Sequence, residues 1–180
     1  MNTVKYFIAV GLAFLSIGCP ARSLFPLFTE NDLVTVPEIF GTWGDGKGET
    51  YTFLKAADKS YDVVWRNQEG NTGLYKVQLG KLGKSRFLDS SPETKDPDYH
   101  MIATHVISKF SLDGDSLRIA SLQSDWLKKM IGAGTLQIPH VIEDDEVILT
   151  ASTRELQQLV LRAAEDTDAF PNPGALVRLK

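Results

Sequence analysis

The chain has 180 residues, of which 43% are hydrophobic and 23% charged, and its formal net charge is −4. This composition is typical of one globular domain, and it excludes a disordered tail, a collagen-like chain and a protein with several membrane spans. The negative charge argues against a nucleic-acid-binding protein. The single cysteine excludes an intramolecular disulfide framework and a cysteine-rich zinc site.

The first residues are typical of a secretory signal peptide. Lys5 precedes an uncharged apolar run over residues 6–15, which is too short to cross the membrane as a helix, because that takes roughly 20 residues. The run ends in Leu15-Ser16-Ile17-Gly18-Cys19, which resembles the lipobox of bacterial lipoproteins. In that family the cysteine thiol is acylated, and cleavage makes the cysteine N-terminal. A plain signal peptide cleaved after Ala21 is the alternative.

The lipobox resemblance implies a palmitoylated protein of the bacterial cell envelope, held at a membrane through acylated Cys19. Pro20 follows the cysteine where aspartate would direct retention, so resemblance to enteric lipoproteins favours the outer membrane, facing the periplasm. We therefore expect a signal peptide over residues 1–18, a lipid anchor and tether over 19–36, and a β-rich globular domain over 37–180. The tether is predicted from its prolines and polar residues, although Leu24-Phe25 and Leu27-Phe28 are apolar enough to dock.

Short strands separated by turns are predicted from residue 41 to about residue 120. Tyr61, Val63 and Trp65 alternate with more polar positions, as do Tyr75, Val77 and Leu79, and this period of two indicates half-buried strands. Residues 101–110 form the longest strand candidate. Residues 112–115, which include Gly114, predict a hairpin turn before a return strand over 117–119.

Two helices interrupt the β pattern. Ser124 is predicted to cap a helix over residues 125–131, and Ser152 with Glu155 forms a capping box ahead of a second amphipathic helix. Strands are predicted over residues 147–149 and 176–179. The fold class is therefore mainly β: a single antiparallel, barrel-like domain with two helices near the C-terminal end.

Gly41-Thr42-Trp43 resembles the Gly-x-Trp element that opens lipocalins and related calycin barrels. The resemblance implies that Trp43 closes one barrel end and that Arg178, in the last strand, packs across it. The chain is also similar to small uncharacterised bacterial lipoproteins, through Trp126-Leu127-Lys128-Lys129 and through residues 149–157. That family implies no activity.

Aromatic side chains gather on neighbouring strand candidates, and they leave two alternatives open. A packed barrel would use them as its core, whereas a hollow barrel would use them to line a cavity for an apolar ligand. The cavity candidates are Tyr51, Phe53, Tyr61, Trp65 and Tyr75, in a wider set that includes Trp43 and Phe87.

No catalytic or metal-binding pattern is present. His100, His105 and His140 have no metal-ligand spacing, and the sequence lacks Gly-x-Ser-x-Gly and His-Glu-x-x-His. Two acidic groups, residues 89–98 and 143–146, are interpreted as solvated loops, and glycines 44, 46 and 48 as a turn. We expect no enzyme activity, no cofactor and no metal.

Two functions are compatible with these features. The first is binding of a small apolar or amphipathic ligand in the barrel of an anchored envelope protein. The alternative is a structural or assembly accessory lipoprotein without a ligand cavity, which contacts an envelope protein partner through its helices or an edge strand.

Overall fold

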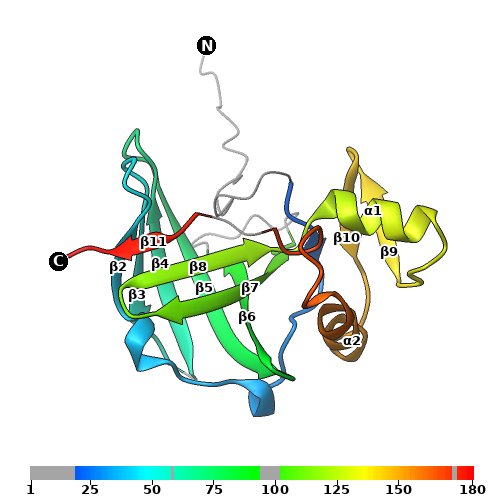
Figure 1. The fold of residues 1–180 in the computed structure, drawn as a ribbon, viewed down its shortest axis with the longest axis horizontal. Helices are drawn as coiled ribbons and strands as arrows, with labels where there is room; N and C mark the ends of the chain where they lie inside the picture. The colour runs from blue at the N-terminus through cyan, green and yellow to red at the C-terminus, as the bar shows by residue number, and fades with distance from the viewer. Residues whose placement is uncertain (1–18, 58, 94–101, 172–173) are drawn as a thin grey trace.

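A computed structural model describes residues 19–57, 59–93, 102–171 and 174–180 (Figure 1). Eight antiparallel strands close into a barrel, and three outer strands and two helices lie beside it, which confirms the predicted fold class. The barrel strands are β2 (Gly41–Gly44), β3 (Thr50–Lys55), β4 (Ser60–Arg66), β5 (Thr72–Leu82), β6 (Ser85–Pro92), β7 (His105–Asp113), β8 (Ser116–Ser121) and β11 (Leu176–Arg178).

The barrel is a meander closed by the end of the chain. Consecutive strands from β2 to β8 pair with one another, and β11 returns to pair with both β8 and β2. Closure removes the open edges that a flat sheet of these strands would expose. The predicted turn at Gly114 joins β7 to β8, and its positive φ of 55° suits glycine.

Side chains along each strand alternate between the inside and the outside of the barrel, as the period of two in the sequence predicts. The inward-pointing side chains fill the barrel. The buried residues of this barrel core are Val36, Ile39, Trp43, Tyr51, Phe53, Tyr61, Val63, Tyr75, Val77, Leu79, Leu88, Phe110, Leu117, Ile119 and Leu176. Phe87 points the other way and packs against Phe170, with ring centroids 5.8 Å apart, so it does not belong to the inner face.

The outer strands continue the sheet from β7. They are β1 (Arg22–Ser23), β10 (Glu146–Leu149) and β9 (His140–Glu143), in that order, and β9 lies at the edge of the sheet. The prediction covered β10, but it missed β9, which has polar residues at both ends. Figure 1 shows this group with both helices on one side of the barrel.

The two helices begin in different ways. In α2 (Thr153–Ala163), Ser152 and Glu155 form the predicted capping box. In α1 (Ser124–Gly132), Gln123 occupies the N-cap position, so the predicted Ser124 cap is wrong. The Ser124 hydroxyl instead accepts a hydrogen bond from Val147 N at 2.8 Å and so connects the helix to β10.

Residues 20–36 are built into the fold, unlike the tether expected from the sequence. Ala21 N donates to Leu122 O at 2.7 Å, and Arg22 and Ser23 pair with both β7 and β10. Leu27 and Phe28 are 0% and 5% exposed. Burial of these apolar side chains outweighs the turn-forming prolines and polar residues between them.

The segment joins a second hydrophobic core on the outside of the barrel, which we call the outer core. It gathers side chains from the N-terminal segment, both helices, β10 and the outer faces of β6 to β8; its members include Ala21, Leu27, Phe28, Phe87, Ile107, Leu122, Trp126, Leu127, Val147, Leu156, Leu159, Val160 and Phe170. The described helices include none long and apolar enough to span a bilayer.

Candidate functional site

Trp43 lies inside one end of the barrel, with Arg178 stacked on it. Trp43 is 0% exposed, its Nε1 donates to Ile39 O at 2.8 Å, and the Arg178 guanidinium carbon lies 4.2 Å from the ring centroid. Arg178 and Trp43 are direct partners in the β11–β2 pairing. This geometry is a cation–π contact with the indole hydrogen bond satisfied.

Arg178 also holds the segment that crosses this barrel end. Its Nη1 donates to Phe40 O at 2.7 Å, its Nη2 donates to Glu38 O, and its Nε pairs with the Asp115 carboxylate at 3.0 Å. This crossing segment, residues 34–40, contains the short helix η2 (Pro37–Ile39). One guanidinium therefore joins β11, the β7–β8 turn and the crossing segment.

Three of the five predicted cavity residues are packed rather than exposed to a cavity. Tyr51, Phe53 and Tyr61 are 0%, 1% and 1% exposed, although a side chain on the wall of a water-sized cavity would have accessible surface. Phe53 and Tyr61 make an edge-on contact with centroids 6.4 Å apart. The lumen around these three residues is therefore filled.

Trp65 and Tyr75 lie on the neighbouring strands β4 and β5. Trp65 is partly buried, and its Nε1 donates to Glu49 Oε1 at 2.5 Å; Tyr75 is 7% exposed. Burial raises the pKa values of Tyr51, Tyr61 and Tyr75, and the Glu49 carboxylate adds to the effect at Tyr51. All three phenols therefore stay protonated at neutral pH.

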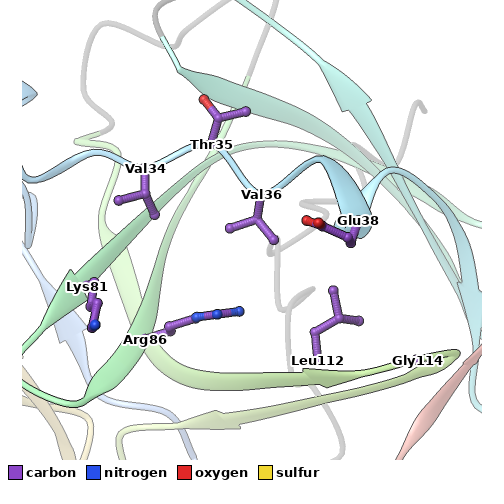
Figure 2. A pocket seen from close by; sticks show the side chains of 8 residues that line it. All are labelled: Val34, Thr35, Val36, Glu38, Lys81, Arg86, Leu112 and Gly114. Atoms are coloured by element: carbon purple, nitrogen blue, oxygen red, sulfur yellow. The ribbon is translucent and has the colours of Figure 1, made fainter.

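A cleft of about 470 Å³ opens beside the barrel end at which Arg178 stacks on Trp43 (Figure 2). One wall is the crossing segment, and the other is formed by the β5–β6 and β7–β8 hairpins. Its lining combines apolar and charged side chains: Val34, Thr35, Val36, Glu38, Lys81, Arg86, Leu112 and Gly114. Its volume lies within the range of small-molecule sites, which is roughly 300–1,000 Å³.

Hydrogen bonds to the barrel fix the apolar wall of this cleft. Val36 N donates to Tyr61 Oη at 2.7 Å, and Val34 N donates to Leu79 O at 2.9 Å. Leu33 forms a bridge with Gly80. The wall is therefore preformed, which lowers the entropic cost of binding.

The prediction missed the cleft because its residues come from four separated segments. A partial signal was present in the sequence: Gly83-Lys84 is a two-residue turn, and such a turn places Lys81 opposite Arg86. Val34, Thr35 and Val36 of the other wall fall in the stretch that the sequence predicts as tether, whereas Glu38 falls in the predicted domain.

A larger hollow, of about 690 Å³, lies beside the N-terminus of α2. Its lining includes Ser152 and Glu155, whose side chains are engaged in the capping box. Those groups are already satisfied, so this hollow offers fewer free polar groups than the cleft at the barrel end.

Cys19 is exposed at the start of the described chain, beside β10. Its Sγ donates to Glu146 Oε1 at 2.9 Å, and its carbonyl accepts from Ser124 N at 3.0 Å. Partial burial and the neighbouring Glu146 raise the pKa of the thiol to about 11. Only Pro20 and Ala21 separate Cys19 from β1.

The described histidines have structural partners. His105 Nδ1 lies 2.7 Å from Asp89 Oδ1, and the other Asp89 oxygen accepts from Leu27 N at 2.6 Å. His140 Nδ1 lies 2.8 Å from Ile138 O, whereas His100 is outside the described residues. Asp89 is 2% exposed within β6, so its assignment to a solvated loop was wrong.

The acidic side chains in the described part of the chain do not form a metal site. No group of three or more His, Cys, Asp or Glu side chains there is arranged to hold an ion. In the second acidic group, Glu146 pairs with Arg22 at 2.9 Å and Asp145 pairs with Lys128 at 3.0 Å. Asp96 and Asp98 of the first group lie outside the described residues.

Comparisons with known proteins found no matching family, no matching curated protein and no matching solved structure. The candidate sites therefore rest on the sequence and geometry of this chain. Among them, the cleft is the described hollow that combines a preformed apolar wall with free charged side chains.

Proposed function

We propose that this protein is a lipid-anchored protein of the bacterial cell envelope that binds a small amphipathic ligand at one end of its barrel. The observation that carries the binding proposal is the cleft, in which Val34, Val36 and Leu112 lie next to Lys81 and Arg86. Apolar surface beside polar groups that orient the ligand is the usual composition of a small-molecule site. The closed barrel is compatible with the lipocalin-like architecture that the Gly-x-Trp resemblance implies.

Packing of the lumen supports a ligand site outside it. Tyr51, Phe53 and Tyr61 fill the lumen near Trp43, and opening a cavity there would separate well-packed aromatic rings. The cleft needs no such rearrangement. The proposed ligand site is therefore a groove on the barrel rim.

Anchoring through Cys19 rests on the lipobox resemblance and is supported by the position of the residue. Cys19 is exposed, and β1 begins three residues later, at Arg22. Without a spacer, the anchor would hold the fold close to the bilayer. Several acyl chains on one cysteine bind membranes firmly, because each buried CH₂ contributes about 0.8 kcal/mol.

Two measurements test this proposal. Palmitate labelling of the full-length chain in a bacterial host should be abolished by Cys19→Ser, and persistent labelling of that variant would refute the anchor. Native mass spectrometry after exposure to a lipid extract should detect a discrete bound mass that is released on denaturation. A clean unliganded mass would refute ligand binding.

A second candidate function uses the edge strand β9. Val141 and Ile142 are 50% and 58% exposed there, and alternate backbone groups of an edge strand point outward. This surface fits an assembly partner that adds a strand. Ile142→Lys should then abolish crosslinking to an envelope protein, and unchanged crosslinking would count against this function.

A further inference from the structure

Two cations stand directly opposite each other at the rim of the cleft. Lys81 and Arg86 are register partners in the β5–β6 hairpin, and both line the hollow. Like charges at directly opposite positions of an antiparallel pair destabilise it. Both residues are exposed, so an anion from solvent can reach the pair and relieve this repulsion.

The described residues provide no ion-pair partner for either cation. Their ion pairs join other cations to acids, and neither Lys81 nor Arg86 takes part in one. Glu38 is the one acid in the lining, and no ion pair connects it to either cation. The three charged side chains leave the cleft with a net charge of +1.

The apolar side of the cleft lies within reach of the same two cations. In Figure 2, the Arg86 side chain extends between Val36, on the crossing segment, and Leu112, on β7. A guanidinium presents parallel donors that match a carboxylate or phosphate in two-point contact. An acidic group held there would place an attached hydrocarbon against Val34, Val36 and Leu112.

We propose that the cleft binds the acidic head group of an anionic amphipath between Lys81 and Arg86, with its alkyl portion against the crossing segment. The inference rests on the proposed ligand-binding function and adds the charge of the ligand. The shared chemistry is a carboxylate or phosphate on an alkyl chain. A neutral amphipath would leave both cations without a counter-charge.

Photoaffinity labelling of the full-length chain tests this inference. The protein is reconstituted in nanodiscs of neutral phosphatidylcholine, so that the added probe is the only anionic lipid present. Three diazirine-bearing probes of equal chain length are compared: a dodecyl carboxylate, a dodecyl phosphate and a dodecyl alcohol. We expect an anionic probe to label residues 34–38, 81–86 or 112–114 about tenfold more than the alcohol does.

Two double variants distinguish specific recognition of the anion from nonspecific binding of the probe. Lys81→Gln with Arg86→Gln should reduce anionic labelling of the cleft about tenfold. The matched control is Lys76→Gln with Arg118→Gln, which removes the same two types of charge from exposed positions on β5 and β8. Undiminished labelling in the cleft variant would overturn the inference.

The probes also distinguish failure of this inference from failure of the proposed function. Equal labelling of the cleft by alcohol and acids would overturn the anionic ligand and leave amphipathic binding intact. Labelling of the cleft by no probe would overturn both. A preference for the carboxylate or for the phosphate would assign the head group.

Arg86→Glu gives a readout that a purely structural role cannot reproduce. It places a carboxylate opposite Lys81, so the unliganded protein should melt at a higher temperature because the cross-strand repulsion is replaced by attraction. The same variant should lose anionic labelling. A lower melting temperature together with retained labelling would contradict the inference on both counts.

Discussion

The barrel core and the outer core differ in how far apart in sequence their residues lie. Barrel strands β2 to β8 follow one another along the sequence, and only β11 arrives from far away. The outer core brings Leu27 and Phe28 together with Leu156 and Phe170, more than a hundred residues later. Local alternation therefore explains the first core, whereas the second depends on contacts that no local pattern specifies.

The largest expected effect comes from removal of the Trp43 side chain. Trp43→Ala should lower the free energy of unfolding by about 4 kcal/mol, because it leaves a cavity in the barrel core and removes the Arg178 and Ile39 contacts. Chemical denaturation measures this loss. A change below about 1 kcal/mol would mean that Trp43 does not close the barrel.

Two substitutions in the N-terminal segment test whether this segment is a loose tether or part of the outer core. Leu27→Ala should cost about 3 kcal/mol, because Leu27 is 0% exposed within the outer core. Phe25→Ala is the matched control, since Phe25 is 49% exposed in the same segment, and it should cost about 0.5 kcal/mol or less. Equal and small effects would restore the tether interpretation.

Asp89 connects the N-terminal segment to β6 and β7 of the barrel, so its removal should loosen that segment. Asp89→Ala should cost about 2 kcal/mol, since it leaves Leu27 N and the His105 ring without their partner. Asp113→Ala, an exposed acid at the end of β7, is the control. Hydrogen exchange should show lost protection in residues 21–28, and unchanged protection there would contradict the assigned role.

Alkaline pH should weaken the barrel core before the outer core. Tyr51, Tyr61 and Tyr75 all belong to the barrel core, and their pKa values are raised in the folded state. Above about pH 10 the unfolded chain releases these protons while the folded chain retains them, so stability falls as pH rises. Below that pH the contribution is fully present.

The expected slope is about 1.4 kcal/mol per pH unit for each tyrosine that stays protonated in the folded state. Denaturation monitored at Trp43 and at Trp126 separates the two cores, because each tryptophan belongs to one of them. Stability that stays constant between pH 9 and pH 11 would contradict the burial of these phenols.

The difference between the cores also explains which predictions held. Alternation at Tyr61, Val63 and Trp65, the turn at Gly114 and the Ser152 capping box each depend on neighbours in sequence, and all appear in the structure. Docking of residues 20–36 depends on distant partners. The missed strand β9 is different, because it pairs with its sequence neighbour β10 across the two-residue turn at Asp144 and Asp145. The cleft combines both kinds: the Lys81–Arg86 pairing follows from a local turn, but the facing wall comes from the docked segment.

The most direct test of the account is where on the barrel an amphipath binds. Residues 19–180 with Cys19→Ser contain every described element, and methyl NMR spectra of this chain can be followed during titration with dodecanoate. The account predicts shifts at Val34, Val36 and Leu112 on the rim, with Val63 and Val77 in the filled lumen unchanged. Shifts centred on Val63 and Val77 would instead show a lumen that opens for its ligand and would contradict the proposed rim site.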